Sequence, residues 1–296
     1  MKQKIDLSKK PLVSIICSAV RPKNWMSIYK SCYPTSLVDL EFVFVGPNTP
    51  DYALPDNFQF IHSNVKPSQC IEIASRNIRG DFIMIVADDC ILQGEKPIDT
   101  LYKKFLTYKN DKIIVSCIYV MDGKIMQPET LLKNDLSAPK LPIAALMKSS
   151  IYRQLGGLDK NFIAVMADLD LYFRFYSIGG DVVFSDIHLS EDRIVASAGI
   201  SLCIDYHDKD KNYLLSAWVK NGKHQSNRLK KFEPFEDKDI IKISQGPRGR
   251  WRGNRFLIFE KIIDTPRLFK NFFILIAQVK RYPEFLYRIL LSFIKK

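Results

Sequence analysis

The 296-residue chain lacks several features that would place it in a common class. No apolar run approaches the roughly 18 residues that cross a bilayer, and the first residues, MKQKIDLSKKPL, lack the apolar core of a secretory signal. None of the six cysteines forms a CxxC pair, and most lie in apolar runs, which disfavours zinc and disulfide roles. These absences predict a cytoplasmic protein with reduced cysteines in its core.

The charge of the chain is unevenly distributed. Residues 221–296 carry 18 Lys/Arg and 7 Asp/Glu, whereas residues 1–220 carry 26 and 25, out of a net charge of +12. A near-neutral body with a basic C-terminal part favours an anionic surface as partner. We therefore expect two parts, a main domain over 1–222 and a basic helical extension over 223–296.

Apolar runs that alternate with helical patterns predict a doubly wound α/β sheet, mostly parallel and flanked by helices. The predicted strands are 12–17, 40–46, 58–62, 81–87, 112–120, 142–148 and 181–186. The predicted helices are 23–32, 67–79, 98–108, 149–155, 167–178 and 212–222. The sequence MDGK predicts a hairpin turn at 121–124, because Asp-Gly tolerates positive φ.

Two groups of carboxylates follow these elements. Asp88 and Asp89 end the strand over 81–87, and Asp159, Asp168 and Asp170 surround the start of the helix over 167–178. A carboxylate pair at the end of a buried strand is typical of a site for a hard cation with a phosphate-bearing ligand. A second carboxylate group on the same face would supply the base of a transfer reaction. The pattern predicts an enzyme that acts on a nucleotide-activated substrate.

Four segments in order resemble a family 2 glycosyltransferase with the GT-A fold, over roughly residues 11–220. They are VSIICSAVRP, IASRNIRGDFIMIVADDC, SSIYRQLGGLDKNF and ADLDLYFRFYSIGG. In this family a DxD-type motif after the fourth strand binds Mn²⁺ or Mg²⁺, which bridges the phosphates of a nucleotide sugar. The resemblance implies that Asp88 and Asp89 hold this metal, although Val86 stands where the first aspartate is usual.

Relatives often complete the metal site with a histidine after the last core strand. His207 is the better placed here, and His188 is the alternative. The resemblance also makes Asp168 the general base of an inverting transfer, with Ala167 in place of the usual glutamate. Asp170 would orient the loop or Arg174, which lies four residues further along the same helix. Both aspartates could instead favour the helix N-terminus electrostatically.

Further residues match the family's nucleotide and sugar positions. Arg76 belongs to a Ser-Arg-Asn segment that approaches the nucleotide, where an arginine can pair with phosphate. The loop Ser18-Ala19-Val20-Arg21 should line the same pocket. Where the family reads uridine with an aspartate, this chain has Val-Gly-Pro followed by Asn48, so UDP is only the first donor to test.

The segment Gly156-Gly157-Leu158-Asp159 resembles the family's Gly-Gly-Phe-Asp, which lines the sugar and acceptor side. Gly157 would allow close backbone approach, and Asp159 would accept hydrogen bonds from sugar hydroxyls. A helix C-cap followed by a turn explains the same residues, and both interpretations can hold together.

The C-terminal part suggests the setting of the reaction. Helices predicted from Thr265-Pro266 and Tyr282-Pro283 combine apolar faces with flanking basic residues, which fits an amphipathic element on an anionic membrane surface. The same apolar faces could instead pack on the catalytic domain. The stretch GPRGRWRGNRF resembles a nucleic-acid-binding segment, but no nucleic-acid fold accompanies it.

Together these features predict a metal-dependent, inverting glycosyltransferase of the hexosyl or a related class. It would move a sugar from a nucleotide sugar to a glycan or lipid-linked acceptor at the inner face of a membrane, in polysaccharide biosynthesis. One alternative is a catalytically inactive glycan- or membrane-binding module on the same scaffold. Another is a nucleotidyltransferase, which is disfavoured because CSAVRPKNW lacks the glycine-rich loop expected after the first strand.

Overall fold

The computed structural model describes residues 10–33, 35, 37–121, 123–126, 139–191 and 193–244. The strands are β1 (Val13–Ser18), β2 (Leu40–Gly46), β3 (Phe58–His62), β4 (Phe82–Ala87), β5 (Cys90–Gln93), β6 (Ile113–Met121), β7 (Lys124–Met126), β8 (Leu146–Lys148), β9 (Asp181–Glu191), β10 (Val219–Lys220) and β11 (Lys223–His224). The helices are α1 (Pro22–Ser31), α2 (Pro67–Ser75), α3 (Pro97–Leu106), α4 (Ser149–Gln154), α5 (Ala167–Ser177), α6 (Arg193–Trp218) and α7 (Asp237–Ser244).

Nine strands form one mixed sheet in the order β3-β2-β1-β4-β8-β6-β9-β5, with β7 added beside β6. The pairs among β3, β2, β1 and β4 are parallel, as is the pair of β6 with β9. The short strand β8 runs antiparallel between β4 and β6. The predicted α/β class is therefore confirmed, with a parallel N-terminal half joined to a mixed half.

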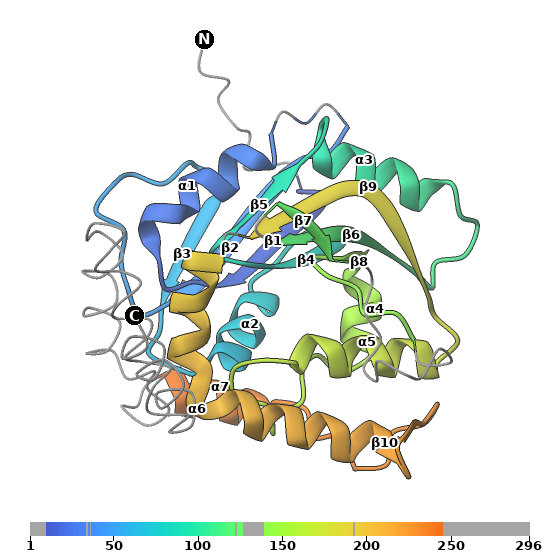
Figure 1. Ribbon diagram of the computed structural model, residues 1–296. Coiled ribbons are helices and arrows are strands. Elements are labelled where there is room, and N and C mark those ends of the chain that lie inside the picture. The colour runs from blue at the N-terminus through green and yellow to red at the C-terminus, as the bar shows by residue number, and fades with distance from the viewer. Residues whose placement is uncertain are drawn as a thin grey trace, which may run out of the picture.

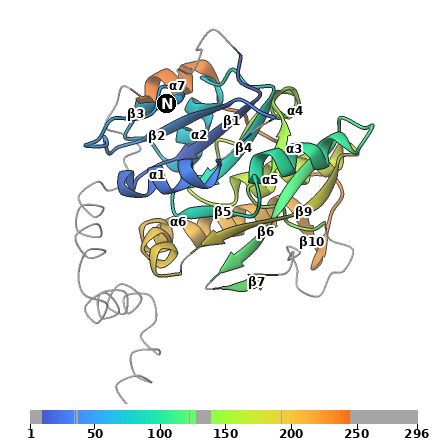
Figure 2. The same ribbon diagram turned by 90° about the horizontal axis from the view of Figure 1, so that it is seen from above.

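Helices cover both faces of this sheet, with α1 and α3 on one face and α2, α4 and α5 on the other (Figure 1). The turned view in Figure 2 looks onto the face of the sheet that α1 and α3 cover. Neighbouring residues of β1 serve the two faces, because side chains alternate along a strand. Ile15 packs in the core with Trp25 of α1, and Ile16 packs in the other core with Leu171 of α5.

The strands buried on both faces were the easiest elements to predict, because they are continuous apolar runs. Strands β2 and β3 have the predicted bounds, and the β6–β7 hairpin forms with Gly123 at φ +75°. Helix α2 ends at Ser75, short of the predicted 79, because Arg79 and Gly80 are bonded to Glu41 instead. Strand β5 and residues 193–211 of α6 were not predicted.

The C-terminal part is described only as far as residue 244. The helices predicted from Thr265 and Tyr282 lie outside the described residues, so the division into 1–222 and 223–296 stays a prediction. Within 223–244, Phe235 is buried in the core on the α5 side of the sheet. No helix among the described residues is long and apolar enough to cross a membrane.

Candidate functional site

A cavity of about 360 Å³ opens where β1 and β4 end. Parallel pairing puts Ser18 opposite Ala87, so the loops after both strands meet at one edge of the sheet. The starts of α2 and α5 and the end of β9 complete its wall. The lining residues with nitrogen- or oxygen-bearing side chains are Ser18, Arg21, Ser68, Asp88, Asp89, Asp168 and Glu191. This edge of an α/β sheet is where ligands of such folds bind.

Asp88 is buried and fastens two loops together. Its Oδ2 accepts hydrogen bonds from the backbone N–H groups of Val20 and Arg21, each at 2.6 Å. The Asn24 side chain donates to its backbone carbonyl at 3.1 Å. Burial raises the pKa of the Asp88 carboxyl, and the Arg21 charge and the two backbone donors oppose that rise.

Of the described residues that line the cavity, Arg21 is the one with a basic side chain. Its guanidinium pairs with Asp88 at 3.2 Å and more closely with Asp89. Burial lowers the pKa of Arg21, but the two carboxylates outweigh burial and raise that pKa above its ordinary value. The guanidinium therefore stays charged, and its Nε has no hydrogen-bond partner among the described residues.

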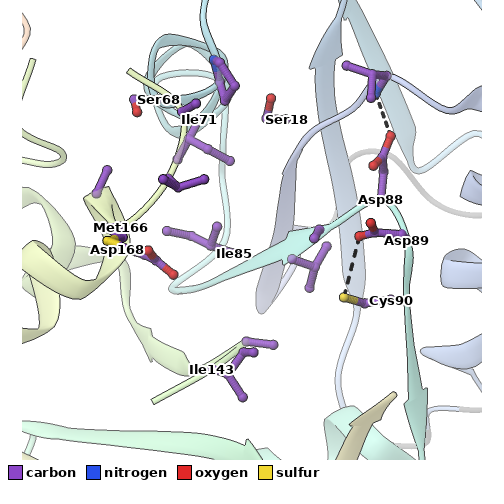
Figure 3. Close-up of a pocket in the computed structure, with 18 of the residues that line it drawn as sticks. Ser18, Ser68, Ile71, Ile85, Asp88, Asp89, Cys90, Ile143, Met166 and Asp168 are labelled. Carbon is purple, nitrogen blue, oxygen red and sulfur yellow. Dashed lines mark hydrogen bonds between the residues drawn. The ribbon is translucent and has the colours of Figure 1, made fainter. Parts of the chain in front are cut away.

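Asp168 lies on the other side of the cavity, in the first turn of α5. Figure 3 shows its carboxylate pointing toward the centre of the cavity, across from Asp88 and Asp89. Burial raises the pKa of Asp168, and a backbone hydrogen bond from Leu169 at 3.0 Å opposes the rise. A carboxylate with a raised pKa in a cavity is suited to accept a proton.

Two residues of the cavity wall adopt a left-handed backbone that side chains disfavour. Met166, which precedes α5, has φ +63°, and Ala144, which precedes β8, has φ +40°. Such conformations persist only where the surroundings impose them, and they cluster at functional sites. Met166 sets the direction in which α5 begins, and so determines where Asp168 points.

Sequence reasoning missed two polar residues of the cavity wall. Glu191, at the end of β9, accepts a hydrogen bond from Tyr119. It went unnoticed because the predicted strand ended at 186, five residues too early. Ser68, in the first turn of α2, is buried, and its Oγ has no hydrogen-bond partner among the described residues. Its proximity to Pro67, a recognisable helix start, was the available signal.

Asp170 does not line the cavity, although it is two residues from Asp168. It is fully buried, and Oδ1 accepts hydrogen bonds from Trp218 and Arg228, each at 2.8 Å. Its Oδ2 accepts one from Arg174, also at 2.8 Å. The predicted contact with Arg174 is present. Because Asp170 lies outside the cavity lining, its position does not support the predicted contact with a bound nucleotide sugar.

Asp159 belongs to the same buried network rather than to the cavity wall. Its carboxylate pairs with Arg228 and accepts hydrogen bonds from Tyr213 at 3.2 Å and from Asn161 at 2.8 Å. Gly157 precedes it with φ +74°, and a Cβ there would lie 2.5 Å from the Glu72 carboxylate. These residues hold the turn between α4 and α5, which agrees with the turn interpretation of this segment.

Arg76 also lies away from the cavity lining. It pairs with Glu72 at 2.6 Å and donates to the Phe235 carbonyl at 2.7 Å, so it joins α2 to the segment before α7. Asn48 donates to the Val20 carbonyl at 2.7 Å and supports the first loop from behind. Ala19 is buried, and its backbone N–H donates a hydrogen bond to the Val45 carbonyl. Of the first loop, Ser18, Val20 and Arg21 line the cavity.

The predicted metal ligands do not gather in one place. His207, on α6, contacts Asp208 and lies outside the cavity lining, and His188 pairs with Gln93 between β9 and β5. No group of three or more metal-ligating side chains occurs among the described residues. Asp88 and Asp89 still offer hard oxygen ligands, and Mg²⁺ or Mn²⁺ often takes one or two carboxylates with the rest supplied by substrate phosphates. The donor set therefore fits a cation that arrives with a phosphate-bearing ligand.

The cysteines agree with the prediction of reduced core residues. The cysteines with described side chains are buried and free, namely Cys17, Cys32, Cys70, Cys90 and Cys117. Cys90 lines the cavity beside Asp89, but burial raises the pKa of its thiol well above the ordinary value. It is therefore not a thiolate nucleophile at neutral pH.

Comparisons with known proteins give structural neighbours only. No family model matches the chain, and no curated protein matches it. Among solved structures it is similar to S. aureus TarS 1-349, with 12% identity over 69% of each chain and a TM-score of 0.48. It is also similar to S. aureus TarS, with 13% identity over 69% of this chain and 42% of that one, at a TM-score of 0.46.

A third neighbour is S. aureus TarS 1-349 in complex with UDP, with 12% identity over 69% of this chain and 70% of that one, at a TM-score of 0.45. Likenesses this weak assign neither an activity nor a ligand to this chain. What the chain does must be argued from the residues of its own cavity.

Proposed function

We propose that this protein is a glycosyltransferase that moves a sugar from a nucleotide-sugar donor, with a UDP-sugar as the first to test, to a hydroxyl of a glycan or lipid-linked acceptor. One observation carries the proposal: Asp88 and Asp89 line one side of a cavity whose other side holds Asp168. Asp88 and Asp89 suit a cation that neutralises the leaving diphosphate, and Asp168 suits the deprotonation of the attacking hydroxyl.

The reaction is a single displacement. The acceptor oxygen forms a bond to the anomeric carbon while the bond from that carbon to the diphosphate breaks, so the configuration inverts. The acceptor proton passes to the Asp168 carboxylate, whose raised pKa matches the task better than that of an ordinary aspartate. The nucleoside diphosphate leaves on the side of Asp88 and Asp89.

The cavity wall offers the remaining functions. Asp88 and Asp89 would hold Mn²⁺ or Mg²⁺, which supplies neutralisation of the leaving diphosphate when bound. The Ser68 Oγ, which has no hydrogen-bond partner among the described residues, lies at the N-terminus of α2, where an anion or a sugar oxygen is favoured. Apolar side chains, including those of Ile71, Ile85 and Ile143, line other parts of the wall and would limit the access of water to the reacting atoms.

The test combines donor binding with turnover. Thermal shifts with UDP, GDP, CDP and dTDP, each with and without Mn²⁺, should identify one nucleotide that stabilises the protein by mass action. With the matching nucleotide sugar, Asp168→Asn should keep the thermal shift but release the nucleotide roughly 10²–10⁴-fold more slowly. Asp186→Asn, which removes an exposed carboxylate outside the cavity, is the matched control.

Two results would contradict the proposal. If no nucleotide shifts the melting temperature, the cavity is no donor site and a binding module becomes the better explanation. Full turnover in Asp168→Asn would remove Asp168 as the base while leaving donor binding intact.

A further inference from the structure

The cavity is more acidic than a site for a nucleoside diphosphate should be. Its lining carries four carboxylates, of Asp88, Asp89, Asp168 and Glu191, against the single guanidinium of Arg21. A diphosphate is itself an anion, and like charges in a low-dielectric cavity repel it. A donor of the proposed kind therefore needs additional positive charge where it binds.

Arg21 already occupies the two carboxylates that would hold such a charge. Its Nη2 lies 3.2 Å from Asp88 Oδ1, and its Nη1 pairs closely with Asp89 Oδ2. The other oxygen of Asp88 accepts the two backbone N–H bonds of the first loop. The fourth oxygen, Asp89 Oδ1, faces the Cys90 thiol at 3.9 Å. A cation that binds both carboxylates therefore competes with the guanidinium for them.

The arginine is held less completely than its burial would suggest. Its side chain is 9% exposed, yet Nε has no hydrogen-bond partner among the described residues. A buried donor without a partner is costly, so the guanidinium has a donor to offer an incoming ligand. Its planar fork matches the oxygens of a phosphate.

We propose that Arg21 is the resident counter-ion of Asp88 and Asp89, which it releases to a divalent cation when a nucleoside diphosphate enters, and that it then pairs with the diphosphate. This inference rests on the proposed function. The formal charges of the site explain why the arginine would move. Arg21, Asp88 and Asp89 together carry a formal charge of −1, which a divalent cation changes to +1. Metal and nucleotide therefore bind together, each weakly without the other.

Titration of Mn²⁺ alone, followed by the loss of its free-ion electron paramagnetic resonance signal, tests the competition directly. The wild type should bind Mn²⁺ weakly, and Arg21→Gln should bind it roughly 5–150-fold more tightly, the usual range for coupled sites. Lys30→Gln removes one positive charge from an exposed position on α1 and should match the wild type. UDP should raise the Mn²⁺ affinity of the wild type and have a smaller effect on Arg21→Gln.

The same Mn²⁺ titration of Arg21→Lys tests the competition if Arg21→Gln does not fold. A lysine keeps the charge but cannot span both carboxylates, so Mn²⁺ affinity should lie between the wild type and the glutamine variant. Equal Mn²⁺ affinity in all variants, or UDP binding that is as tight in EDTA as in Mn²⁺, would overturn the inference while leaving the glycosyltransferase proposal standing. Tighter Mn²⁺ binding by the arginine variants without any nucleotide binding would support the competition and reject the proposed function.

Discussion

Two clusters of arginine and aspartate lie in this protein, and they differ in how fully their charges are matched. The cavity cluster, Arg21 with Asp88 and Asp89, has one guanidinium for two carboxylates. The internal cluster has two guanidiniums, of Arg174 and Arg228, for the carboxylates of Asp159 and Asp170.

Neutral partners complete the internal cluster. Trp218 donates to Asp170, and Arg174 donates to the Leu155 and Gly157 carbonyls. In the cavity cluster the Arg21 Nε remains without such a partner among the described residues. Since buried charges are retained at low cost only when fully paired, the complete cluster behaves as scaffold and the incomplete one as a binding surface.

The largest expected effect is a loss of stability when one arginine of each cluster is replaced. Arg228→Gln should lower the free energy of unfolding by about 3–5 kcal/mol, because it leaves the buried Asp159 carboxylate without its guanidinium partner, although Asp170 keeps Arg174. Arg21→Gln should cost less, since Asp88 keeps its two backbone donors and Asp89 borders the cavity. Urea denaturation of both variants measures the difference. Equal losses would show that the cavity cluster is scaffold as well.

The next effect concerns Asp168, which belongs to neither cluster and has no basic partner among the described residues. As the base it must be deprotonated, so kcat/KM should fall as the pH drops through its pKa. Because burial raises that pKa, the acidic limb should lie above the value of about 4 that is usual for aspartate. A pH–rate profile measures this, and a limb at or below the ordinary value would show that the titrating base is another group.

The smallest effect is a gain in stability. A carboxyl whose pKa is raised by folding destabilises the folded state at pH values above its unfolded pKa, and this penalty disappears as the pH falls toward that value. Asp168→Asn removes the penalty, so its melting temperature should exceed the wild type's at pH 8 and approach it at pH 5. A lower melting temperature at pH 8 would mean that the Asp168 carboxylate stabilises the fold.

How far the sequence led is clearest in the acidic residues themselves. Asp88, Asp89 and Asp168 were predicted to share one site, because strand ends and helix starts meet at one edge of an α/β sheet, and all three line the cavity. Asp159 and Asp170 come from the same segment but face inward. Their partner Arg228 is distant in sequence, in a stretch whose composition predicts a basic extension, so local pattern could not separate them from Asp168.

The backbone bonds that Asp88 accepts from Val20 and Arg21 have a consequence for how the chain can vary. Val20 and Arg21 lie 68 and 67 residues before Asp88 in the sequence, so these bonds join two distant loops into one continuous part of the cavity wall. A length change in either loop would move those donors and the acceptor apart. An insertion or deletion in one loop therefore requires a matching change in the other. We expect homologous chains to keep both loop lengths or to change both.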